Sequence, residues 1–122
     1  MLGLFQRPKL AADFAAAHAH TDEFTRVVEL AGALTLRNDG SEAQIGDVEM
    51  VLIAGFRRIP LDVAAEWRAL TLGSGADKRG DVSWSMTLDA PLRAEKGELY
   101  VSVRDQKRKK WEWRLPFAFE RS

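Results

Sequence analysis

The chain has 122 residues, no cysteine, and eighteen basic side chains that balance eighteen acidic ones. This length fits one domain whose core is large enough to fold without a metal ion or a disulfide. The composition excludes disulfides, thiol catalysis and cysteine-bound zinc, and the neutral charge provides no overall field toward nucleic acid or anionic membranes.

The start of the chain predicts a cytoplasmic protein. Residues 1–5 are apolar, but Arg7, Pro8 and Lys9 interrupt this run. It therefore does not have the pattern of a secretion signal, and no stretch of the chain reaches the ~20 apolar residues of a membrane-spanning helix.

The alanine-rich segment that follows predicts a short amphipathic helix over residues 8–19. Alanine is the strongest helix former, and Leu10, Phe14 and Ala17 would fall on one side of a helix. We therefore divide the chain into an N-terminal apolar tip and helix, residues 1–22, and a β-sandwich domain, residues 23–122.

From residue 24 onward, apolar residues alternate with polar ones, which is typical of strands. The turn at Asn38–Ser41 is expected to join two strands into a hairpin, and a bulge or bend is expected at Gly32. Residues 64–72 fit a helix or a strand, and we expect a strand. The expected strands lie near residues 24–37, 45–54, 59–63, 64–72, 82–88, 99–103 and 111–119.

The last of these segments carries the clearest pattern. Its odd positions are large and apolar, whereas its even positions are charged or small. This alternation predicts a long strand whose apolar side lies on the core, and it argues against an exposed tryptophan platform. The apolar positions are Trp111, Trp113, Leu115, Phe117 and Phe119.

About seven short strands separated by turns predict an all-β fold, an antiparallel immunoglobulin-like sandwich with a short N-terminal helix. Residues 32–53 contain Gly32-x-Leu34-x-Leu36, then Gly40-Ser41, Gln44-Ile45 and Val48-x-Met50-x-Leu52. This pattern resembles the early strands of arrestin-like domains, most closely those of the bacterial sporulation-control branch. The resemblance implies a non-enzymatic scaffold for protein interactions.

His18 and His20, with Asp22 and Glu23 nearby, are the residues most suggestive of a metal site. On a helix the two histidines would point about 200° apart, because a helix has 3.6 residues per turn. We therefore expect them to decorate a helix end, and we expect no metal.

Catalytic motifs are weak. The chain has no Gly-x-Ser-x-Gly sequence, and Gly73-Ser74-Gly75 is not followed by the Gly-Lys-Ser/Thr of a phosphate loop. The sequence therefore predicts no enzyme and no cofactor.

A basic hairpin tip is the strongest candidate for a binding site. Its cations adjoin two tryptophans, which suggests either contact with an acidic protein surface or single-stranded nucleic-acid binding by residues 104–114. A solvated tip that keeps a sheet edge from pairing is the alternative without a function. We expect a cytoplasmic interaction scaffold with a protein partner and a homodimer, nucleic-acid binding being the second hypothesis. The candidate residues are Arg104, Lys107, Arg108, Lys109 and Lys110.

Overall fold

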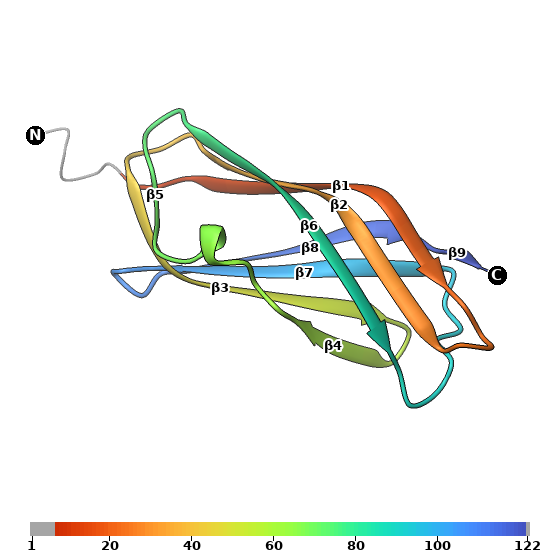
Figure 1. Cartoon of the computed structure of the whole chain (residues 1–122). Coiled ribbons are helices and arrows are strands. Elements are labelled where there is room, and N and C mark those ends of the chain that lie inside the picture. The colour runs from red at the N-terminus through yellow and green to blue at the C-terminus, as the bar shows by residue number, and fades with distance from the viewer. Residues whose placement is uncertain (1–6, 122) are drawn as a thin grey trace, which may run out of the picture.

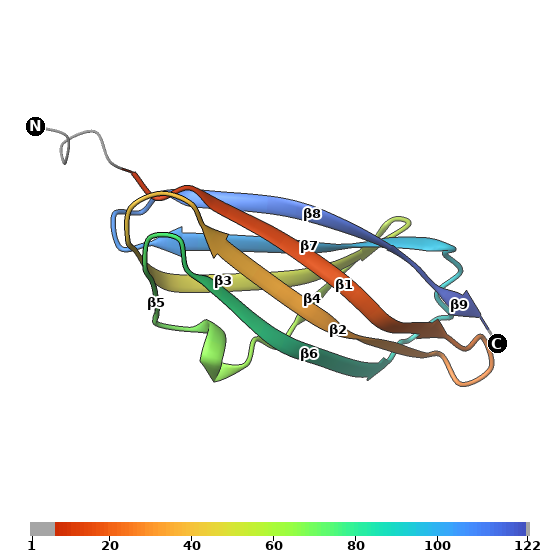
Figure 2. The same ribbon diagram turned by 90° about the horizontal axis from the view of Figure 1, so that it is seen from above.

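The computed structural model describes residues 7–121, which form two β-sheets stacked face to face (Figures 1 and 2). One sheet has the strand order β6-β2-β1-β9, and the other has the order β4-β3-β7-β8 with β5 also paired to β3. All pairings are antiparallel except the short parallel pairing of β1 with β9. The strands are β1 (Leu10–Thr21), β2 (Val27–Asn38), β3 (Ala43–Ala54), β4 (Arg57–Leu61), β5 (Leu70–Leu72), β6 (Asp77–Thr87), β7 (Lys96–Asp105), β8 (Lys110–Ala118) and β9 (Glu120–Arg121).

The predicted all-β sandwich is thus confirmed, but the predicted N-terminal helix is wrong. Within residues 7–121 the helical element is a single 3-10 turn, η2 (Ala65–Trp67), and the segment predicted as a helix is strand β1. β1 pairs with β2 from Leu10 to Thr21, and a bulge between Ala16 and His18 shifts the register. The bulge moves the inward positions from even to odd numbers, so the β alternation was hidden in the sequence. Pairing with a neighbouring strand outweighs the helix propensity of alanine. The apolar tip predicted at residues 1–5 lies outside the described residues.

The predicted hairpin between β2 and β3 is also wrong. The turn exists, but β2 belongs to one sheet and β3 to the other, so the chain arches between the layers (Figure 1). The fully buried Asn38 holds this arch. Its amide donates hydrogen bonds to the carbonyl oxygens of Ser41 (2.7 Å) and Leu72 (2.9 Å), and its Oδ1 accepts from the backbone of Lys9 and Gly40. These local bonds favour a crossing between sheets over a two-strand turn.

The core lies between the two sheets. Alternate positions of β2, β3 and β7 supply most of it, as the sequence pattern predicts. Trp67, at the end of the 3-10 turn, has no exposed surface and fills one side of the core. A Cβ added to Gly80 would lie 2.7 Å from the Trp67 ring, so the strand packs directly on the indole.

Strand β8 has the predicted alternation, but its apolar side is only partly covered. Trp113, Leu115 and Phe117 pack against the core while remaining half-buried, and Phe119 is buried. The Phe117 ring meets Phe14 at 6.0 Å and Phe119 at 5.1 Å between centroids. The incomplete burial arises because β8 is the edge strand of its sheet.

Candidate binding site at the open side of the sandwich

The two long sides of the sandwich differ. On one side the chain passes from β8 into β9, which pairs with β1 of the other sheet and joins the two layers (Figure 2). On the other side the edge strands are β4 and β6, and no strand pairing connects them. This side of the sandwich is therefore open.

A groove of about 620 Å³ lies at this opening. Its walls are residues 59–64, which include the end of β4, and residues 83–88 of β6 and the turn that follows. Its apolar side chains are half-buried: they pack on the core and still face the groove. These side chains are Ile59, Val63, Trp84, Met86 and Leu88.

Three hydrogen bonds, donated by Trp84 and Arg57, hold the walls of the groove at a fixed spacing. The indole Nε1 of Trp84 donates a hydrogen bond of 2.8 Å to the backbone oxygen of Asp62. Arg57 donates to Asp89 Oδ1 at 2.8 Å and to the carbonyl oxygen of Ala90 at 3.2 Å. The hydrogen bond and the positive charge of Arg57 lower the pKa of Asp89 below its usual value. The groove is therefore preformed.

The backbone of β6 faces this opening with unpaired groups. The N–H of Leu88 donates to Arg26, and the N–H of Asn38 donates to Ala76, so even-numbered residues of β6 bond to β2. Since successive residues of a strand direct their backbone groups to opposite sides, the odd-numbered ones face outward. No residue in the described part of the chain forms a hydrogen bond with the outward backbone groups of residues 83, 85 and 87.

Three other sheet edges, those of β4, β8 and β1, are protected against such pairing. β4 contains Pro60 and β8 contains Pro116, and proline cannot donate the backbone bond that an added strand would need. The edge of β1 lies beside β8. Within β6 the first half carries charged side chains, whereas Ser83, Ser85 and Thr87 are uncharged. Residues 83–87 are therefore an unprotected edge beside an apolar groove.

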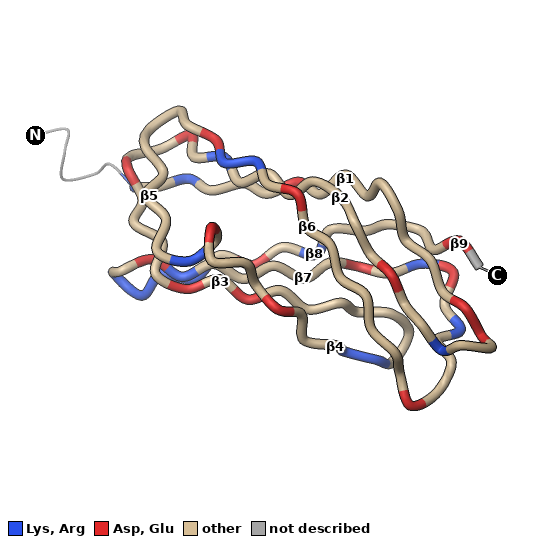
Figure 3. Tube along the Cα trace, in the orientation of Figure 1, with Lys and Arg blue, Asp and Glu red and all other residues tan. Residues whose placement is uncertain are grey.

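The predicted basic tip is found where the sequence placed it, in the turn between β7 and β8 (Figure 3). Asp105 organises the turn by accepting the backbone N–H of Lys109 at 2.8 Å. Two of the cations already have partners: Lys110 pairs with Glu112 at 2.9 Å, and Lys109 lies 4.9 Å from the centre of the Trp111 ring.

The pairing with Glu112 raises the pKa of Lys110 and lowers that of Glu112. Arg104 lies opposite Asp47 in the register with β3. Lys107 and Arg108 are exposed and take part in none of the ion pairs among residues 7–121. The free positive charge of the tip is thus smaller than the sequence suggests.

Replacing Lys107, Arg108, Lys109 and Lys110 by Ser or Gln should leave the urea midpoint of unfolding nearly unchanged, because these side chains lie on the surface. If the tip contacts an acidic protein, the same variant should lose that partner in a pull-down, and the wild-type contact should weaken with salt. Unchanged partners would assign the tip to plain surface.

The histidine pair lies on a strand and not on a helix. The rings of His18 and His20 stack at 5.8 Å, and His18 Nε2 lies 3.1 Å from Glu29 Oε2. Within residues 7–121 no cluster of three or more His, Asp or Glu side chains could hold a metal ion. In the same range, no helix is long and apolar enough to cross a membrane.

Sequence reasoning missed the groove because its walls are far apart in the chain. Two features of the sequence point toward it: residues 82–88 alternate without a proline, and Pro60 predicts that its own strand lies at a sheet edge. Which edges face each other depends on the topology, which the pattern does not reveal.

The fold and the groove define an all-β sandwich with an accessible strand edge at β6. No family model and no curated protein matches the chain. Among solved structures, it is similar to a Bordetella pertussis protein assigned as ApaA, with a TM-score of 0.55 and 13% identity over 94% of this chain and 97% of that one. It is also similar to the structural genomics target SoR45, with a TM-score of 0.54 and 9% identity over 98% of this chain and 89% of that one.

These similarities concern the fold. They overturn the resemblance to arrestin-like and sporulation-control domains, since the chain superposes over nearly its whole length on the Bordetella pertussis protein and on SoR45. The motif at residues 32–53 misled because it consists of alternation and turn residues, which many β-proteins share.

Proposed function

We propose that this chain is a non-enzymatic protein-interaction module, built on an immunoglobulin-like sandwich, that captures an extended segment of a partner protein. The segment would add to the outer edge of β6 as a further strand. The observation that carries this proposal is the unpaired backbone of residues 83–87 beside the apolar groove. In strand addition, main-chain hydrogen bonds supply affinity and alternate side chains supply specificity.

The groove suggests the chemistry of that segment. Every second side chain would enter the groove and contact Trp84, Met86 and Ile59, so apolar residues suit those positions. Asp81 lies in β6 two residues before Ser83, and Asp62 lies on the facing wall of the groove beside Trp84. Both are exposed and take part in no ion pair among the described residues. A segment that alternates apolar and small residues and has Lys or Arg at its ends is therefore favoured.

A second contact is proposed at the basic tip, where Lys107 and Arg108 are available to an acidic protein surface. The geometry gives less support to the alternative of single-stranded nucleic-acid binding. That function needs aromatic rings beside free cations. Here Lys109 covers Trp111, and Trp113 packs on the core.

Selection from a displayed library of short random peptides tests the main proposal. We expect enriched peptides to alternate apolar and small residues, to carry basic ends, and to bind the wild-type protein. Ser85→Pro removes one outward N–H from β6 and should abolish this binding, whereas Ser85→Ala keeps that N–H and should retain it.

No enrichment, or equal binding to the Ser85→Pro protein, would contradict strand addition at β6. A circular dichroism spectrum that matches the wild type shows that the variant is folded. The Ser85→Ala protein controls for loss of the hydroxyl group.

A further inference from the structure

A second surface lies at the turn between β3 and β4. This turn consists of Gly55 and Phe56, and Gly55 has a φ of 60°. A turn of this geometry requires glycine at its first central position, but its second central position, Phe56, does not need to be aromatic. Phe56 is nevertheless fully exposed, although a buried phenylalanine would gain about 1.5–3 kcal/mol from leaving water.

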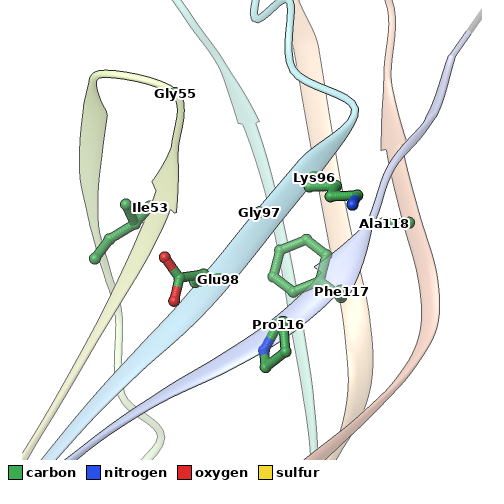
Figure 4. A pocket seen from close by; sticks show the side chains of 8 residues that line it. All are labelled: Ile53, Gly55, Lys96, Gly97, Glu98, Pro116, Phe117 and Ala118. Carbon is green, nitrogen blue, oxygen red and sulfur yellow. The ribbon is translucent and has the colours of Figure 1, made fainter.

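A pocket of about 510 Å³ adjoins this turn on the outer side of β3, β7 and β8 (Figure 4). Its wall is mainly apolar and includes Ile53, Pro116 and Phe117. The pocket has room beside these side chains because Gly55, Gly97 and Ala118 are small. Lys96 and Glu98 add one charge of each sign. Phe56 does not occupy the pocket of its own chain, since its side chain is fully exposed.

We infer that Phe56 and this pocket form a self-complementary interface between two copies of the chain. Because the exposed Phe56 ring lies next to the pocket, one two-fold axis would place each Phe56 in the pocket of the other copy. Both pockets would then be filled and the interface closed, as in an isologous dimer. The net charge of zero gives no long-range repulsion between copies.

The size of the contact sets its strength. Two rings that each bury about 150–250 Å², with equal areas of pocket wall, account for roughly 600–1,000 Å² in total. This area belongs to the class of weak or transient interfaces, so we expect a dimer that forms in the micromolar range or above. The inference concerns a different surface from the β6 edge and does not depend on the proposed function.

Sedimentation equilibrium over increasing protein concentrations tests this inference. We expect wild-type protein to pass from monomer to dimer, and Phe56→Ser to raise the dimer dissociation constant about a hundredfold through the loss of both rings. Ala118→Trp, which fills the pocket, should also yield a monomer. Phe24→Ser is the matched control, because Phe24 is also almost fully exposed and lies on a different turn.

A mixture of the Phe56→Ser and Ala118→Trp proteins adds a test of the geometry. Each pair of different copies keeps one ring and one open pocket, so the heterodimer in the mixture should form at lower concentrations than the dimer of either variant alone. A wild-type monomer at every concentration, a dimer that survives Phe56→Ser, or assembly beyond the dimer would overturn the inference. Loss of the dimer in Phe24→Ser would overturn it as well.

Discussion

Replacing Trp67 by alanine should lower the free energy of unfolding by about 3–5 kcal/mol, the usual cost of removing a large buried aromatic side chain. Trp67 has no exposed surface, and it packs directly beneath Gly80 of β6. It also lies 5.6 Å from the ammonium group of Lys78. Urea denaturation measures the loss, which would be a large share of the ~5–15 kcal/mol stability of a domain.

Trp67→Phe is the matched control. The indole N–H of Trp67 is buried and forms no hydrogen bond with any residue in the described range, so phenylalanine removes no polar contact. We expect this variant to lose much less stability than Trp67→Ala. An alanine variant that unfolds at nearly the wild-type urea concentration would show that Trp67 does not support the core.

The second large effect concerns proline substitutions in β6. Met86→Pro should destabilise the protein by about 2–4 kcal/mol, because the N–H of residue 86 faces β2 and its loss breaks the ladder. Ser85→Pro should cost much less, because the N–H of residue 85 faces outward. Peptide binding, in contrast, should disappear in the Ser85→Pro protein.

The same urea titration, followed by a peptide-binding assay on each folded variant, measures both effects. Pro60 and Pro116 show that this fold tolerates proline in its edge strands. Equal destabilisation by the two substitutions would mean that the register of β6 with β2 differs from the one described here.

The sequence predicts a strand correctly where apolar and polar residues alternate without interruption. The alternating segments 82–88, 99–103 and 111–119 coincide with β6, β7 and β8, but β6 begins at Asp77, in a segment that the sequence predicts to be a loop. The sequence predicts a helix at β1, because the bulge between Ala16 and His18 divides the alternation of this strand into two short halves. The bulge expected at Gly32 is instead on the opposing strand β1. A Cβ at Gly32 would collide with the carbonyl oxygen of Ala15 on that strand.

The candidate site could be predicted only in part. The basic tip follows from residues that are consecutive in the chain, so composition was enough to find it. The groove joins residues 59–64 to residues 83–88, and their approach depends on the arch at Asn38 that sends β2 and β3 to different sheets. No local pattern specifies that crossing, because the same turn residues also suit a hairpin.

Amide hydrogen exchange along β6, with and without a selected peptide, tests strand addition most directly. In the free protein, we predict slow exchange at Trp84 and Met86, which bond to β2, and fast exchange at Ser83, Ser85 and Thr87. Bound peptide should slow exchange at these three outward amides and leave the even-numbered ones unchanged. A peptide that binds tightly while Ser83, Ser85 and Thr87 continue to exchange at their free rates would contradict the account.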